Sequence, residues 1–221
     1  MARFRLVIAG AGGLARDVEW LSREITLAGG TRFEFVGYIV SDLTKISARD
    51  SKSQIIGDLD WLEKNVKNVD GLAIGIGTPK ARLDVARELT ARFPQLEWPS
   101  LVHPSARYDA ASCRIEAGVQ ICAGTYGTVN VKVGRYTMLN LGCTVGHETV
   151  IGEGCVVNPG ANISGGVTIG DGVLVGSGAQ ILQYLSVGDG AKIGAGAVVI
   201  KDVPAHTTVI GYLAKALGAQ H

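Results

Sequence analysis

The sequence from Ile115 to Val199 carries an aliphatic residue at almost every sixth position. Fourteen of the fifteen residues on this register are Ile, Val or Leu, and the exception is Gly127. No helical period gives a strict repeat of six, whereas short strands that wind around a common core do. The register therefore predicts a parallel β-helix in which these aliphatic side chains point inward.

A second repeat, of eighteen residues, lies on the first. The segments Ile-Gly-Glu-Gly at 151–154, Ile-Gly-Asp-Gly at 169–172 and Val-Gly-Asp-Gly at 187–190 are each eighteen residues apart. Three hexads therefore form one coil, and we expect a triangular prism of about five coils with glycines at its corners. Each coil buries the apolar face of its neighbour.

The first hundred residues have a different pattern. Strand-like runs at 6–9, 33–40, 71–76 and 97–102 alternate with helix-like runs, which are 14–28, 58–64 and 79–93. Such alternation predicts a small parallel sheet with helices on both faces. Because His103-Pro104 breaks the pattern, we expect a Rossmann-like α/β domain at 1–104 and an all-β domain, the parallel β-helix, at 105–206. A tail at 207–221 follows, and we expect its apolar segment 212–217 to cap the open end of the prism.

A glycine-rich turn follows the first strand. Gly10, Gly12 and Gly13 form the pattern G-x-G-G, which is an incomplete dinucleotide-binding fingerprint. Amides at a helix N-terminus suit a phosphate, and an acidic residue after the second strand, here Asp42, often contacts a ribose or base. Thr78, before Pro79, is expected to be the N-cap of the third helix. A tight turn that binds nothing explains the glycines equally well, and both interpretations stay open.

Composition excludes several classes of function. The net charge is +1 and there is no basic patch of the kind that nucleic acid requires. No run of eighteen apolar residues predicts a membrane span, and the N-terminus lacks a signal-peptide core, so we expect a cytoplasmic protein. The four cysteines form no C-x-x-C pair, so we expect no metal. Three of them lie two residues before an inward hexad position and are interpreted as packing residues: Cys113, Cys143 and Cys155.

One of the four histidines stands out. His147 lies in the repeat, two residues after the inward Val145 and directly before Glu148. Its slot does not point inward, so it does not serve the core. By position alone, an exposed corner residue and a catalytic base are both consistent. His103 is interpreted as structural, and His206 and His221 as exposed to solvent.

Five segments spread over nearly the whole length carry a family resemblance: 7–13, 73–77, 139–142, 145–152 and 194–204. They include the turn Gly10-Ala11-Gly12-Gly13 and the sequence Val145-Gly146-His147-Glu148. The chain resembles the hexapeptide-repeat acyltransferases, and in particular the sialic acid O-acetyltransferase family that includes the UDP-amino-sugar N-acetyltransferases.

The resemblance implies a left-handed β-helix, a homotrimer with active sites between neighbouring prisms, and acetyl-CoA bound in the groove between two prisms. It implies that His147 takes the proton from the acceptor, that Glu148 orients the imidazole, and that Asn140 contacts the acceptor. The first domain would hold the nucleotide of a nucleotide-linked sugar through residues that include Gly10, Gly12, Gly13, Asp42 and Thr78. The positions implied to contact CoA are Val156, Gly165, Ser177 and Ala195.

The sequence departs from the family at two places near the predicted base. An acidic residue often precedes the histidine, where this chain has Gly146, and a second histidine commonly lies where it has Val156. From the family resemblance we expect an acetyl-CoA-dependent transferase acting on the amino group of a nucleotide-linked sugar, without a metal. The alternatives are O-acetylation of a sialic acid or another glycan hydroxyl, a nucleotide-sugar-binding trimer without activity, and a purely structural trimer.

Overall fold

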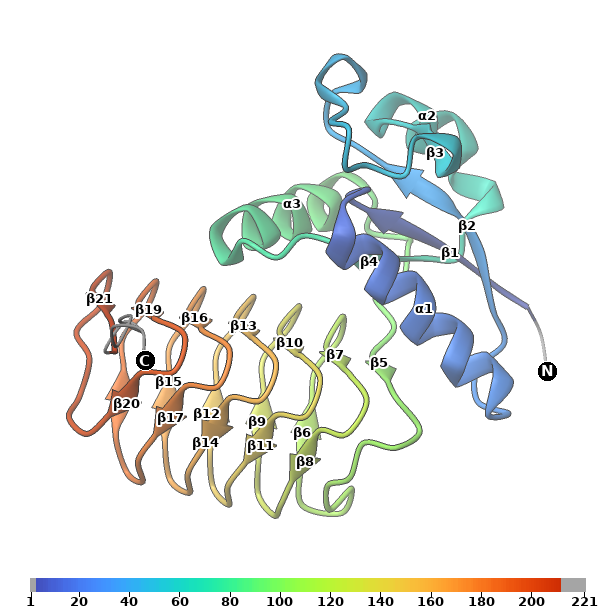
Figure 1. Cartoon of the computed structure of the whole chain (residues 1–221). Helices are drawn as coiled ribbons and strands as arrows, with labels where there is room; N and C mark the ends of the chain where they lie inside the picture. The colour runs from blue at the N-terminus through green and yellow to red at the C-terminus, as the bar shows by residue number, and fades with distance from the viewer. Residues whose placement is uncertain (1–2, 212–221) are drawn as a thin grey trace, which may run out of the picture.

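The computed structural model describes residues 3–211, and the predicted capping segment 212–217 lies outside that range. The first domain is built on four parallel strands in the order β3-β2-β1-β4 (Figure 1). The strands are β1 (Phe4–Ala9), β2 (Phe33–Ile39), β3 (Ile55–Gly57) and β4 (Gly71–Ile74). The helices are α1 (Gly13–Leu27), α2 (Leu59–Asn65) and α3 (Pro79–Arg92), with short 3-10 turns η1 (Leu43–Lys45), η2 (Lys52–Gln54) and η3 (Val66–Asn68).

Helices cover both faces of this sheet, as predicted. Val18 and Leu21 of α1 pack with Leu6 and Ile8 on one face. The other face packs on α2 and α3, through residues that include Leu62, Ala86 and Leu89. The alternation of side chains along β1, with Leu6 and Ile8 on one side and Val7 and Ala9 on the other, explains why both faces must be covered.

The rest of the described chain, up to residue 211, is a left-handed parallel β-helix with three faces. Face 1 contains β5 (Leu101–Val102), β7 (Gln120–Ile121), β10 (Met138–Leu139), β13 (Val156–Val157), β16 (Leu174–Val175), β19 (Lys192–Ile193) and β21 (Thr208–Val209). Face 2 contains β8 (Tyr126–Gly127), β11 (Thr144–Val145), β14 (Asn162–Ile163), β17 (Gln180–Ile181) and β20 (Val198–Val199). Face 3 contains β6 (Arg114–Ile115), β9 (Lys132–Val133), β12 (Val150–Ile151), β15 (Thr168–Ile169) and β18 (Ser186–Val187).

The inward side chains are those of the six-residue register. From Ile121 to Val199, the aliphatic members of the register form one buried cluster. At the exception, Gly127, the space of the missing side chain is taken by a residue outside the register. A Cβ at Gly127 would lie 3.2 Å from Cβ of Tyr108. Tyr108 packs against the same core, so the glycine makes room for an aromatic ring at the first coil.

The structure corrects the predicted last strand of the first domain. We expected one strand over 97–102, but its two ends pair with different sheets. Glu97 forms a bridge with Gly71 of β4, whereas Leu101–Val102 pairs with β7 and begins face 1 of the prism. Pro99 lies between these pairings, and it cannot donate a ladder hydrogen bond.

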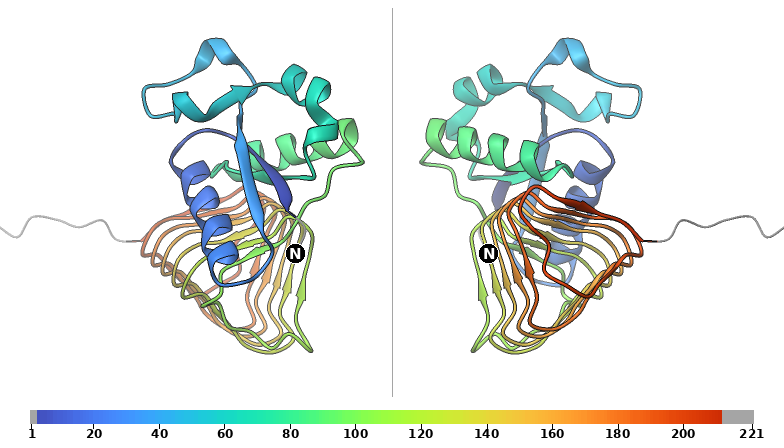
Figure 2. Two further views of the ribbon diagram at one scale, coloured as in Figure 1. Left: turned by 90° about the vertical axis from the view of Figure 1, so that its right-hand side faces the viewer. Right: turned by 90° about the vertical axis from the view of Figure 1, so that its left-hand side faces the viewer.

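The first domain lies over face 1, so corner 2/3, where face 2 meets face 3, is on the opposite side of the prism (Figure 2). Leu101, Cys122 and Met138 of the prism pack with α1, and Trp98 and Tyr136 pack with α3. Within the described range, no helix is long and apolar enough to cross a bilayer.

Candidate active site

A cavity in the first domain opens at the carboxyl ends of β1 and β4. The chain moves outward from β1 through β2 to β3 and then returns to the other side of β1, so the strand order reverses between β1 and β4. Ligands bind at such switch points in parallel sheets. Gly10 has φ +108°, and a Cβ there would lie 2.9 Å from the carbonyl oxygen of Gly75. Glycine is therefore required at this position.

The cavity has a volume of about 230 Å³ and a mixed lining. Its walls include apolar side chains from β2, α2 and α3, such as Ile39, Leu59 and Leu89, while three carboxylates stand around it: Asp42, Asp50 and Glu88. Apolar walls with a few polar groups suit a nucleobase or sugar. Of the five residues predicted for the nucleotide-linked sugar, the structure brings Gly10 and Asp42 together here.

The other three predicted residues lie nearby but do not line this cavity. Gly12 is the N-cap of α1 and Gly13 its first residue. Thr78 is the N-cap of α3, as predicted, but its side chain makes no capping hydrogen bond. It faces a second hollow between α3 and the last coils.

Two cavity residues were missed from the sequence. Asp50 lies in the polar segment between β2 and β3, and it reaches the glycine turn because Ser51 N–H donates to the carbonyl of Ala11 at 2.9 Å. Glu88 lies on the helical face of α3 that borders the cavity. Asp42 also has a local role, because its carboxylate accepts hydrogen bonds from the amide and hydroxyl of Thr44 at 2.9 and 2.6 Å.

The predicted base and its acid lie together at corner 2/3. His147 follows β11, and Nδ1 of its ring lies 3.5 Å from Oε2 of Glu148. The two side chains are 51% and 60% exposed, so the pair is open to a ligand. The main chain is held firmly, because Gly166 N–H donates to the His147 carbonyl at 2.7 Å.

The imidazole lies over Gly165, one coil further along. A Cβ at Gly165 would be 2.5 Å from Nε2 and 2.6 Å from Cε1 of His147. Gly165 does not have the left-handed φ of a corner glycine such as Gly166. Its lack of a side chain is therefore explained by the space that the imidazole occupies.

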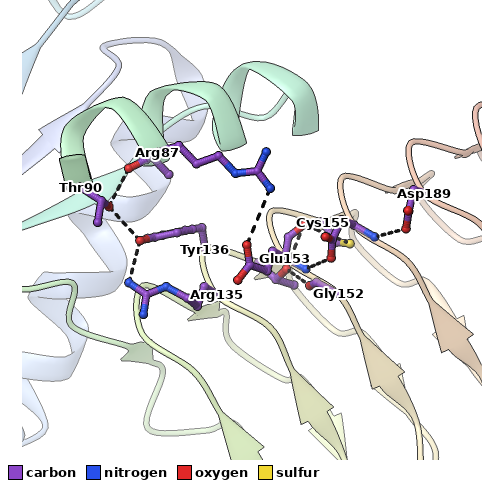
Figure 3. Close-up of polar contacts among 11 residues, drawn as sticks. Arg87, Thr90, Arg135, Tyr136, Gly152, Glu153, Cys155 and Asp189 are labelled. Atoms are coloured by element: carbon purple, nitrogen blue, oxygen red, sulfur yellow. Dashed lines mark hydrogen bonds and ion pairs between the residues drawn. The ribbon is translucent and has the colours of Figure 1, made fainter. Parts of the chain in front are cut away.

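The amides at this corner differ from those at the corner between faces 3 and 1. There, Glu153 N–H donates to Asp171 and Asp171 N–H donates to Asp189, each at 2.8 Å (Figure 3). In the repeat, His147 corresponds to Glu153 and Gly165 to Asp171, six residues earlier. Among residues 3–211, no acceptor binds the amide of His147 or Gly165. Two N–H groups are thus free beside the imidazole.

The remaining predicted contacts lie elsewhere on the prism. Asn140 is 9% exposed at the corner between faces 1 and 2, and its side-chain oxygen accepts from Leu141 N–H at 2.8 Å. Ser177 and Ala195 are exposed at the same corner. Val156 is 2% exposed on face 1 and offers almost no surface to a ligand. Its role in CoA binding stays a prediction that this geometry does not favour.

The cysteines are packing residues, as interpreted. Cys143 and Cys155 are fully buried in the prism core, and Cys113 packs against it. Burial raises the pKa of Cys143 to about 11 and the pKa values of Cys122 and Cys155 to about 12. Their thiolates are therefore scarce at neutral pH. Nowhere in the part of the chain that the structure describes do three or more His, Cys, Asp or Glu side chains gather as a metal site.

Comparisons with known proteins agree with this architecture. The family model described as bacterial transferase hexapeptide (six repeats) matches residues 148–183 and 166–201. No curated protein matches the sequence. The predicted resemblance to hexapeptide-repeat acyltransferases is confirmed by this match and by solved structures.

Several solved structures are similar over almost the whole chain. A mutant of perosamine N-acetyltransferase from Caulobacter crescentus, in complex with CoA and GDP-perosamine, is 26% identical with a TM-score of 0.79, and the match covers 93% of both chains. The acetyltransferase domain of PglB from Neisseria gonorrhoeae FA1090 is 25% identical with a TM-score of 0.78, over 96% of this chain and 99% of that one. WeeI from Acinetobacter baumannii AYE is 25% identical with a TM-score of 0.77, over 95% and 97%.

Proposed function

We propose that this chain, with the fold and repeat of a hexapeptide acyltransferase, moves an acetyl group from acetyl-CoA to the amino group of a nucleotide-linked sugar. The observation that carries the proposal is the corner at His147. The exposed imidazole of His147 lies next to the carboxylate of Glu148 and beside two backbone amides that have no acceptor within residues 3–211. The similar perosamine N-acetyltransferase structure contains CoA and a nucleotide-linked amino sugar.

His147 has the geometry of a general base. Because Nδ1 faces the carboxylate of Glu148, Nε2 is the nitrogen left to accept a proton. Histidine is the side chain best suited to that task near neutral pH. The carboxylate stabilises the imidazolium that forms, and it holds the ring in one tautomer.

The reaction needs no covalent enzyme intermediate. The acceptor amine attacks the thioester carbonyl while Nε2 of His147 takes the amine proton, and a tetrahedral oxyanion forms. The free amides of His147 and Gly165 are suited to donate to that oxygen, since preorganised donors stabilise developing charge. The carbon–sulfur bond then breaks, and the imidazolium returns its proton to the leaving thiolate. The products are an N-acetyl sugar and the free thiol of CoA.

We propose further that the enzyme is a homotrimer and works in the cytoplasm. In one chain, the nucleotide cavity lies above face 1 and His147 lies at the opposite corner. A sugar held in the cavity therefore needs the base of a second copy. Exposed apolar side chains around corner 2/3 support a partner there, including Val129, Leu182, Tyr184 and Ile200.

The acceptor is tested by acetyl-CoA-dependent thiol release with a panel of sugars. The panel pairs nucleotide-linked 4-amino and 3-amino sugars with their hydroxyl counterparts and includes free sialic acid. Turnover is expected with an amino sugar and not with the matching hydroxyl. Turnover restricted to hydroxyl acceptors would replace N-acetylation by O-acetylation. Binding of a nucleotide-linked sugar without turnover would favour a binding protein.

The shared site is tested by mixing two inactive variants. His147→Ala removes the base, and Val85→Trp is designed to fill the cavity that Val85 lines. Subunits that are exchanged by denaturing and refolding the mixture should recover part of the turnover, because some sites then combine an intact cavity with an intact base. If each chain carries a complete site, the mixture stays inactive.

A further inference from the structure

One fully buried arginine joins the two domains without an acidic partner. Arg82 lies on α3 and is 0% exposed. Burial lowers the pKa of its guanidinium to about 9, which still leaves the group charged at neutral pH. No carboxylate within residues 3–211 forms an ion pair with it, so its hydrogen bonds must offset the cost of burying the charge.

The guanidinium binds oxygen atoms of both domains. On the first domain, Nη1 donates to the carbonyls of Ile74 and Ile76, each at 3.1 Å. On the prism, Nε donates to the carbonyl of Tyr136, and Nη2 donates to Oε1 of Gln120 at 2.7 Å. The planar fork of arginine matches four acceptors at fixed angles, which a lysine cannot do.

Gln120 completes this contact from the prism. Its side chain is 0% exposed on β7, and Nε2 donates to the carbonyl of Ile74 at 3.0 Å. Arg82 and Gln120 therefore both donate hydrogen bonds to the carbonyl of Ile74 at the end of β4. Ile76, two residues further on, lines the nucleotide cavity. The wall of that cavity is thus fixed to face 1 through buried, charge-assisted hydrogen bonds.

The other polar contacts between the domains are more exposed. Arg87, five residues further along α3, reaches Glu153 at 3.9 Å, and the two side chains are 61% and 36% exposed (Figure 3). Tyr136 hydroxyl meets Thr90 at 2.9 Å and accepts from Arg135 at 2.8 Å (Figure 3). Exposed ion pairs contribute little to stability, and the Thr90–Tyr136 hydrogen bond is only part-buried. Arg82 and Gln120, which are both 0% exposed, therefore make the most deeply buried of these polar contacts.

We propose that Arg82 is a positioning residue for acetyl transfer, which fixes the nucleotide cavity on face 1 so that the sugar is presented in one orientation. This inference rests on the proposed function. A base on one prism and a nucleotide cavity on another domain can cooperate only if the domain keeps its angle, since a misplacement of the reacting groups by about 1 Å costs about 100-fold in rate.

The test compares Arg82→Met with Arg87→Met, a matched change five residues away on the same helix. Two acceptors are used: the nucleotide-linked amino sugar and the same amino sugar without its nucleotide. Arg82→Met should lower kcat/KM for the linked sugar by about 100-fold, the loss typical of a 1 Å misplacement. It should leave kcat/KM for the free sugar and the Kd of the nucleoside diphosphate unchanged.

Equal loss with both acceptors, or loss no greater than in Arg87→Met, would overturn the proposal. Arg82→Lys provides a second variant if Arg82→Met does not fold. Its kcat/KM for the linked sugar should lie between those of the wild type and Arg82→Met, because lysine keeps the charge but lacks the planar guanidinium. Calorimetry gives a readout that needs no activity. Arg82→Met should unfold in two separate transitions and Arg87→Met in one. A single transition in Arg82→Met would reject the proposal that Arg82 fixes the two domains to each other, even if no acceptor is ever acetylated.

Discussion

Gly165→Ala is expected to slow the enzyme by about 100-fold while leaving its fold intact. A Cβ at this position would lie 2.5 Å from Nε2 and 2.6 Å from Cε1 of His147. Non-bonded atoms of this kind separate to about 3.5 Å, so the imidazole must move by about 1 Å. A misplacement of that size costs about 100-fold in rate, which corresponds to about 2.7 kcal/mol in the barrier.

The cost in stability should be small. The backbone of Gly165 is not left-handed, so alanine is accepted there. The ring that must move is half exposed and can turn into solvent. We therefore expect the free energy of unfolding to change by no more than about 0.5 kcal/mol, as for other surface substitutions.

The assay is steady-state thiol release for the wild type, Gly165→Ala, His147→Ala and the double variant, with denaturant unfolding of each. If the alanine acts only by displacing the imidazole, it has no further effect on kcat in the His147→Ala background. An additional loss there would mean that Gly165 acts through its own contacts. A single variant with the kcat of the wild type would refute the reasoning.

Three further predictions concern stability and reactivity. Arg5 holds the pKa of Asp70 below its usual range, chiefly through a side-chain hydrogen bond of 2.7 Å; the pair therefore stabilises the fold above the unfolded pKa of about 3.9, and this contribution disappears as pH falls through the folded pKa. Asp70→Asn should thus lower the unfolding midpoint at pH 7 and not at strongly acidic pH, and a gap independent of pH would contradict this. In the native protein a thiol reagent at pH 7.5 should modify Cys113 alone, and denaturant should expose the three buried thiols, Cys122, Cys143 and Cys155. Ile163→Ala, in the middle of the prism core, should cost about 2–5 kcal/mol of unfolding free energy, and a loss below about 1 kcal/mol in urea denaturation would show that the core collapses around the gap.

The prism was predictable because its repeat ties each residue to one direction. A hexad places one aliphatic side chain inward in every strand, so a shift of register would expose the whole set. The same periodicity placed His147 on a corner and outside the core. It could not reveal that Gly165 makes room for the imidazole, because that contact joins residues one coil apart.

The parts that were missed depend on tertiary contacts. Leu101 and Val102 look like a buried strand of the first domain, yet they pair with β7. The sequence could not show this, because an apolar run does not indicate which strand it will pair with. Arg82 lies on a polar helix, where an arginine is usually exposed, and only the docking of α3 on face 1 buries it. Asp50 reaches the glycine turn through the path of a loop, which composition does not predict.

The most direct test of the account is the turnover of His147→Ala with acetyl-CoA and a nucleotide-linked amino sugar, beside His206→Ala. His206 is also an exposed corner histidine, and its φ of 57° is left-handed in the wild type. If His147 is the base, its loss should lower kcat by about 100-fold or more, as general-base removal does, with the assembly unchanged by light scattering. His206→Ala should keep the kcat of the wild type. A correctly assembled His147→Ala enzyme with wild-type kcat would contradict the account.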